Sequence, residues 1–218
     1  MVSTNVAVGL SVPRPKVVQA RAKATRLKLL RQAEIAFASK GLNGASLTAD
    51  ILDPAEVSVG SFYHQFENKR EVMLELLAWR LEQRQMKVSR ALVVSQRTWA
   101  SMLLAMSLAF LDDIDQHPNI WVVQFRELQS PDPIVREAII GNMSPWEDAA
   151  AELLKRFSGA PEDRCRTVAR TTMLCLNNVL RDYSAATLEH RESFRDRVLA
   201  PAVELCVGGA ERMLGATL

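Results

Sequence analysis

Two short helical segments separated by a turn constrain the fold of this chain most strongly. Ser46 or Thr48 can cap the first segment, which we expect to reach about residue 52. The pair Asp53-Pro54 should end it, because the residue before a proline disfavours the α-helical conformation. Ser58 can cap the second segment, "SVGSFYHQ", which we expect to end near residue 65.

Longer helical patterns flank this pair on both sides. One runs from about residue 17 to "FASKGLNG", where Gly41 can adopt the positive φ that ends many helices. Asn68 followed by Glu71 resembles a capping box and predicts the start of a long helix, "KREVMLELLAWRLEQRQMKVSRALVV". Two short helices joined by a tight turn and resting on longer ones form the layout of a helix-turn-helix.

The rest of the chain predicts further helices. Helix-forming residues dominate and 48% of the side chains are hydrophobic, which indicates a globular all-α protein. We expect a disordered basic tail over residues 1–16, a helix-turn-helix domain over 17–68, and an all-helical domain over 69–218, with the long helix joining the two domains. Prolines separate the predicted C-terminal helices, which cover residues 98–116, 119–129, 133–142, 145–158, 161–186 and 190–214.

Charge is concentrated at one end. Residues 13–31 carry seven basic side chains and no acidic one, although the whole chain has a net charge of only +2. Such a segment suits contact with a polyanion, and the alternative is an ordinary solvated helix face.

The order of apolar and small residues from about 26 to 77 resembles the N-terminal DNA-binding region of the tetracycline-repressor (TetR) family. The positions that carry the resemblance are Leu29, Leu30, Ala33, Phe37, Lys40, Gly41, Ile51, Ala55, Val57, Ser58, Gly60, Phe62, Tyr63, Phe66 and Lys69. The resemblance implies a cytoplasmic, homodimeric DNA-binding regulator rather than an enzyme. It implies a repressor that a small apolar effector releases from a palindromic operator in double-stranded DNA. The alternative is a DNA-binding protein of the same fold without such an effector, acting through protein partners or occupancy.

The chain departs from the family pattern in the turn. Glu56 stands where a glycine is usual, so we expect a strained positive φ there. Pro54 should shorten the second helix, and one extra residue lies between Gly41 and Ile51.

The second short helix is the candidate reading element. Phe62 and Phe66, four residues apart, should anchor it, whereas the small side chains of Val59 and Ser61 should let the backbone approach DNA bases. Alternatives are that Tyr63 packs in the core and that His64 and Lys69 are ordinary surface residues. The expected DNA-binding residues are Ser46, Thr48, Ser58, Val59, Gly60, Ser61, Tyr63, His64 and Lys69, with an arm formed by Arg14, Lys16, Arg21 and Lys23.

Broad aromatic and flexible methionine side chains in the C-terminal part suit an adaptable apolar pocket, although each could equally belong to an ordinary bundle core. Asn177 adds an amide that needs a partner if it is buried. The expected ligand-binding residues are Trp99, Met102, Met106, Phe110, Trp121, Phe125, Trp146 and Asn177.

Other kinds of site are not expected. Asp112, Asp113 and Asp115 lie near His117, but we interpret them as the solvent-facing end of a helix rather than as metal ligands. No catalytic motif or cofactor fingerprint occurs, and no apolar run is long enough for a membrane span. The cysteines have no metal-ligand spacing and are expected to be small buried hydrophobes.

Dimerisation is expected through the last two long helices. Residues 161–186 and 190–214 carry apolar side chains on more than one face, which requires burial beyond a single core.

Overall fold

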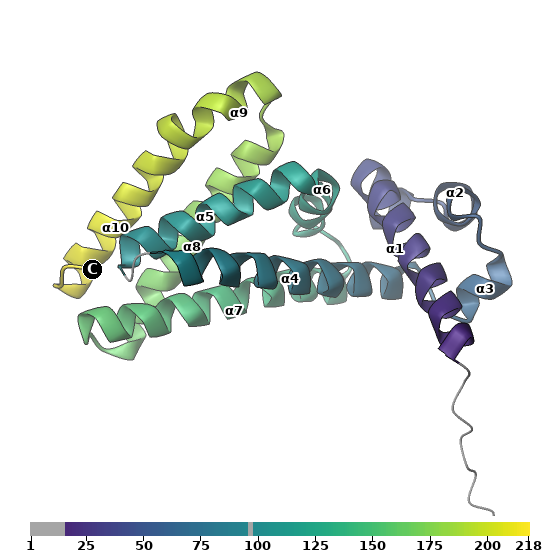
Figure 1. Ribbon diagram of the computed structural model, residues 1–218, viewed down its shortest axis with the longest axis horizontal. Coiled ribbons are helices and arrows are strands. Elements are labelled where there is room, and N and C mark those ends of the chain that lie inside the picture. Colours follow the sequence, from purple (N-terminus) through teal and green to yellow (C-terminus); the bar gives the residue numbers. More distant parts are fainter. Residues whose placement is uncertain (1–15, 96–97) are drawn as a thin grey trace, which may run out of the picture.

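The computed structural model describes the backbone of residues 16–95 and 98–218, with side chains from residue 20 onward except at position 188. The predicted tail, residues 1–16, therefore lies almost wholly outside the described residues. The described chain is all-helical, as predicted. Figure 1 shows a small group of helices at one end, joined by the long helix α4 to a larger bundle whose far end carries the C-terminal helix.

The elements follow the predicted order. The N-terminal part consists of α1 (Lys16–Gly44), the π-helical turn η1 (Leu47–Leu52), α2 (Asp53–Ala55) and α3 (Val59–Tyr63). The connecting helix α4 (Lys69–Val94) leads to α5 (Trp99–Gln116), α6 (Pro118–Glu127), α7 (Pro133–Ser158), α8 (Glu162–Ala185), α9 (Leu188–Phe194), η2 (Arg195–Leu199) and α10 (Ala200–Leu214).

The caps that position α3 and α4 are the predicted ones. The Ser58 Oγ accepts the backbone N–H of Ser61 at 3.2 Å, and the Asn68 Oδ1 accepts that of Glu71 at 3.1 Å. Each oxygen satisfies one of the free N–H groups at a helix start. Gly41 interrupts α1 with φ 72° and ψ 171°, which confirms its predicted role at the end of the first helix.

The second helix is longer than predicted, because Pro54 does not stop it. The backbone N–H of Asp53 donates to the carbonyl oxygen of Thr48, five residues back, as in a π-helix. Pro54 then lies in the single turn of α2. A π turn accommodates one more residue than an α turn, which matches the extra residue between Gly41 and Ile51.

One further predicted break is absent. Pro145 lies inside the continuous helix α7, where it cannot donate a backbone hydrogen bond. Buried residues lie on both sides of it, among them Ile139 and Leu154, so tertiary packing holds the helix together across the proline. The region predicted as one helix over 190–214 is divided into α9, η2 and α10, and the π-helical turn η2 ends two residues before Pro201.

Among the described helices, none is long and apolar enough to cross a membrane.

Glu56 ends the turn of α2 in the left-handed region, with φ 56° and ψ 44°, as predicted. Among the described residues it is the one non-glycine residue with positive φ.

We expect Glu56→Gly to be more stable than Glu56→Ala by about 1 kcal/mol, because only glycine occupies this region without steric cost. Urea denaturation of the two variants, which remove the same charge, measures the difference. Equal midpoints would show that the turn carries no strain.

Candidate DNA interface and effector cavities

The helix α3 presents the predicted reading edge to solvent. Phe62 and Phe66 are buried, with ring centroids 5.9 Å apart, and they fix the helix against the domain core as predicted. Val59 is 49% exposed and Tyr63 is 59% exposed, so the Tyr63 ring is not part of the core. The structure therefore brings Ser58, Val59, Gly60, Ser61, Tyr63 and His64 together on one exposed element.

The two predicted hydroxyls near η1 differ in what they do. Ser46 caps η1 by accepting the backbone N–H of Ala49 at 3.3 Å, while Thr48 is exposed. Asp50 accepts hydrogen bonds from the Lys40 ammonium and from the Ser46 backbone N–H, and these bonds lower the pKa of the Asp50 carboxyl.

The Lys69 ammonium has internal partners. It donates to the carbonyl oxygens of Leu42, at 3.0 Å, and of Ala45. These carbonyls follow the end of the first helix, so Lys69 ties the start of α4 to the loop before η1. In this arrangement the side chain is half-buried within the domain rather than extended toward solvent.

The predicted arm is only partly described. Arg14 lies outside the described residues, as does the side chain of Lys16, whereas Arg21 and Lys23 are exposed on α1. One basic residue of the same run is used internally: Arg26 forms an ion pair with Glu75 and lies 4.3 Å from the centroid of the Phe66 ring.

The N-terminal domain meets the larger bundle at the end of α1. The backbone N–H of Leu42 donates to Glu127 Oε1 at 3.0 Å, and Arg126 donates to the carbonyl of Phe37 at 3.0 Å. A side chain at position 41 would place its Cβ 3.3 Å from that Glu127 oxygen. Gly41 is therefore favoured by its backbone conformation, and a side chain there would also crowd the Glu127 carboxylate of α6.

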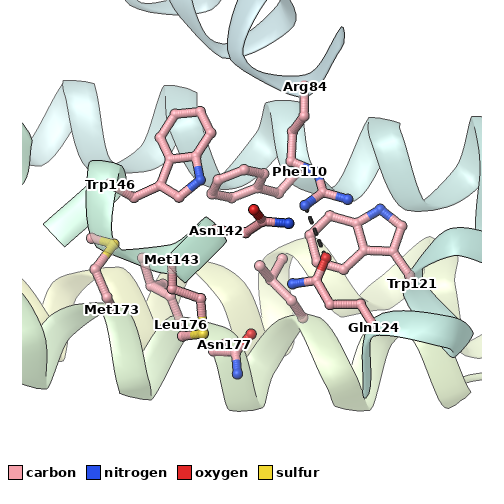
Figure 2. Close-up of a pocket in the computed structure, with 11 residues that line it drawn as sticks. Arg84, Phe110, Trp121, Gln124, Asn142, Met143, Trp146, Met173, Leu176 and Asn177 are labelled. Atoms are coloured by element: carbon pink, nitrogen blue, oxygen red, sulfur yellow. Dashed lines mark hydrogen bonds between the residues drawn. The ribbon is translucent and has the colours of Figure 1, made fainter. Parts of the chain in front are cut away.

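The first of two adjoining cavities lies inside the C-terminal bundle, between α4, α5, α6, α7 and α8 (Figure 2). It is narrow, with a volume of about 40 Å³, which holds only a few atoms. Its walls are mostly apolar and aromatic, and its polar groups come from one guanidinium and three amides. The lining residues are Arg84, Phe110, Trp121, Gln124, Asn142, Met143, Trp146, Met173, Leu176, Asn177 and Leu180.

A buried ionic network forms the polar end of this cavity. Arg84, only 4% exposed, donates from Nε to Asp113 Oδ2 at 3.1 Å and from Nη1 to Gln124 Oε1 at 3.0 Å. The same Asp113 oxygen accepts the indole N–H of Trp121 at 2.9 Å, and the guanidinium lies 4.0 Å from the centroid of a Trp121 ring. Burial lowers the pKa of Arg84, and the charge of Asp113 opposes that shift.

The second cavity is larger and mostly apolar, with a volume of about 310 Å³. Trp146 lines both cavities, and the second one extends from it along α4, α5 and α7. Its walls are formed by Gln85, Val88, Ser89, Leu92, Trp99, Met102, Leu103, Met106, Pro145, Trp146, Ala149, Ala150 and Leu153.

Seven of the eight predicted ligand residues line these cavities. Phe110, Trp121 and Asn177 line the first, Trp99, Met102 and Met106 line the second, and Trp146 lines both. Phe125 lines neither and instead packs on Trp121, with ring centroids 5.7 Å apart. Sequence reasoning missed Arg84 and Gln124, because their partners lie far away along the chain.

The interpretation of the acidic cluster on α5 was wrong for Asp113, which is buried in the Arg84 network. Asp115 accepts a hydrogen bond from the Tyr183 hydroxyl at 2.7 Å, and Asp112 pairs with Lys87 at 2.6 Å. Within the described residues, no group of three or more potential ligands could hold a metal ion. Of the three cysteines, Cys165 is buried as predicted, whereas Cys175 is exposed and Cys206 is half-buried.

The helix-turn-helix region also matches a known family. Residues 29–76 fit the family model of the bacterial regulatory proteins of the tetR family. This N-terminal domain is therefore a TetR-family DNA-binding domain. TetR-family proteins are DNA-binding transcriptional regulators rather than enzymes, and this regulator has the corresponding two-part architecture.

Solved structures share the fold over nearly the whole chain. The fatty acid degradation regulator FadR from Bacillus halodurans is 16% identical, with 88% of this chain and 95% of that chain covered and a TM-score of 0.66. FadR from Bacillus subtilis, solved in complex with stearoyl-CoA, is 16% identical, with 84% and 98% covered and a TM-score of 0.67. SCO4454, a TetR-family regulator from Streptomyces coelicolor, is 18% identical, with 88% and 95% covered and a TM-score of 0.63. Among curated proteins, no sequence matches this chain significantly.

Proposed function

We propose that this TetR-family regulator is a cytoplasmic homodimeric repressor that occupies a palindromic operator and releases it when a small, largely apolar effector binds. The observation that carries the DNA-binding part is the exposed edge of α3, with Val59 and Tyr63 outward and Phe62 and Phe66 buried beneath them. Small and hydrogen-bonding side chains on such an edge suit entry into the major groove.

Roles within the proposed interface follow from exposure. Val59, Ser61 and His64, on the exposed edge, would meet base edges, and Gly60 leaves open space for a close approach. Ser46, Thr48 and Tyr63 would contact the DNA backbone, which sets register rather than sequence preference. Lys69 would act mainly by holding the loop before η1, because carbonyl oxygens already bind its ammonium.

The effector part is supported by the cavities. A solid C-terminal core would favour a regulator without an effector, whereas two adjoining cavities lie between α4 and its neighbours. Apolar cavities with a few convergent polar groups are typical of small-molecule sites. FadR from Bacillus subtilis, which shares the fold, was solved in complex with stearoyl-CoA, and this supports a ligand-binding role for the present chain.

The dimer part is supported by apolar side chains left exposed on the last helices. Leu174 on α8 is 48% exposed, and Leu205 and Met213 on α10 are 69% and 47% exposed. The helices α8 and α10 pack against each other, so these residues can form one surface for a second copy of the chain.

DNA binding is tested with a fragment from upstream of the gene, at low salt, by fluorescence anisotropy. We expect Val59→Glu to weaken binding at least tenfold, because it places an acidic side chain against the phosphates and bases. Val94→Glu makes the same change on an 84% exposed residue at the far end of α4 and should bind as the wild type does. Equal affinity of the two variants, or no binding by the wild type, would contradict the proposal.

The arm is tested by removing residues 1–20, which deletes Arg14 and Lys16 from a protein that keeps the helix-turn-helix. If both side chains contact phosphates, the slope of log affinity against log salt should become shallower by about 2. Anisotropy titrations at four salt concentrations give that slope. An unchanged slope and affinity would remove the arm from the proposed interface.

Dimerisation is tested with Leu205→Glu, which introduces a charge into the proposed contact between copies. We expect the wild type to sediment as a dimer and the variant as a folded monomer, because an unpaired charge is costly to bury. Leu104→Glu, the same change on α5, is the control and should remain dimeric. A dimeric Leu205→Glu variant would place the interface elsewhere.

A further inference from the structure

The first cavity contains one side chain whose hydrogen-bonding direction is fixed by its neighbours. Gln124 on α6 is 5% exposed, and its Oε1 accepts a hydrogen bond from Arg84 Nη1 at 3.0 Å. A guanidinium can only donate, so the amide oxygen must be the atom that faces Arg84. The amide nitrogen Nε2 is therefore directed away from Arg84 and into the cavity (Figure 2).

The orientation of the Gln124 amide is stabilised by the contacts that fix Arg84. Arg84 is itself fixed by Asp113 at 3.1 Å and by the Trp121 ring at 4.0 Å, and Asp113 also accepts the Trp121 indole N–H. No acceptor in the described part of the chain binds Gln124 Nε2. The network thus presents the Gln124 N–H to the cavity, and the buried Arg84 Nη2 beside it also has no hydrogen-bond partner among the described residues. An acceptor for these donors is left to be supplied from outside the chain.

Charge balance limits what that acceptor can be. Arg84 is the one charged residue that lines the cavity, and the buried carboxylate of Asp113 already offsets its charge. A further carboxylate or ammonium beside these buried groups would lack a counter-charge, which is costly where side chains shield the charge from water. An uncharged carbonyl oxygen needs only the hydrogen bond that Gln124 offers.

The remaining walls of the cavity indicate the shape of the rest of the ligand. Phe110 packs edge-on against both Trp121 and Trp146, with centroid distances of 6.0 Å and 5.4 Å. Only a few atoms fit beside Gln124, and Trp146 forms a wall of both this cavity and the larger apolar one of about 310 Å³. The space therefore suits a small polar head attached to an apolar body.

We infer that the effector is an uncharged, largely apolar molecule with a carbonyl oxygen, which accepts a hydrogen bond from Gln124 Nε2 while its body lies against Trp146. This inference rests on the proposed effector function and specifies the ligand class of that site. It assigns Gln124 as the residue that selects for the carbonyl group.

Four probes of similar shape test this class: butyrophenone, butylbenzene, 4-phenylbutyrate and 4-phenylbutylamine. Calorimetric titration of the full-length protein without DNA should show butyrophenone binding three- to tenfold more tightly than butylbenzene, the gain of one neutral hydrogen bond. Both charged probes should bind more weakly than the ketone. Tighter binding of butylbenzene or of either charged probe, or no binding of any probe, would overturn the inference.

Gln124→Glu supplies a near-isosteric second test, because it keeps an oxygen for Arg84 but replaces the donor in the cavity with an acceptor. The ketone should lose its advantage over butylbenzene, and 4-phenylbutylamine should gain affinity. Gln129→Glu, the same change at an exposed position, should leave every ratio as in the wild type. An unchanged ketone preference in Gln124→Glu would overturn the inference, and if that variant does not fold, the wild-type ratios decide.

These titrations separate the inference from the proposed function. Probe selectivity is measured without DNA, whereas release of the operator fragment by butyrophenone is measured by anisotropy. Selective binding without release would refute effector-controlled repression and leave the ligand class intact. Release by another compound, with no preference for the ketone, would refute the ligand class alone.

Discussion

The buried ion pair between Arg84 and Asp113 is the interaction on which the C-terminal bundle depends. It joins α4 to α5, and through Gln124 and Trp121 it includes α6. Removing either charge would leave the other buried and unpaired, which typically costs about 3–5 kcal/mol. One turn earlier on α4, Arg80 pairs with Glu34 of α1 at 2.7 Å. Two arginines four residues apart on one helix thus hold the cavity-lining bundle and the DNA-binding domain to the same element.

The N-terminal domain could be predicted in detail because its information is local. The caps at Ser58 and Asn68, the positive φ at Gly41 and the inward faces of Phe62 and Phe66 all follow from residues within one or two helical turns. The aromatic cavity walls were also predicted, since broad apolar side chains at helical spacing favour burial. The polar end of the cavity was not, because Arg84 meets partners that lie 29 and 40 residues away. Local charge patterning cannot reveal such a pairing.

Prolines explain where the predicted helix boundaries failed. In η1 and η2, the residue just before a proline donates its backbone N–H to the fifth residue back, at Asp53 and Ala200. The widened turn lets each helix continue through Pro54 and Pro201. Pro145 shows a different solution, because buried residues on both sides keep α7 continuous. Helix-stop rules describe isolated segments, whereas packing decides the outcome in a bundle.

The placement of the tryptophans gives this regulator internal optical reporters. The chain has four, of which Trp121 and Trp146 line the first cavity and Trp99 and Trp146 line the second. Trp79 lies instead on α4 beside Arg80, close to the contact with α1. Indole emission depends on the polarity and packing around each ring. Occupation of the cavities and rearrangement at the junction with the DNA-binding domain would therefore change the emission of different indoles, without any added label.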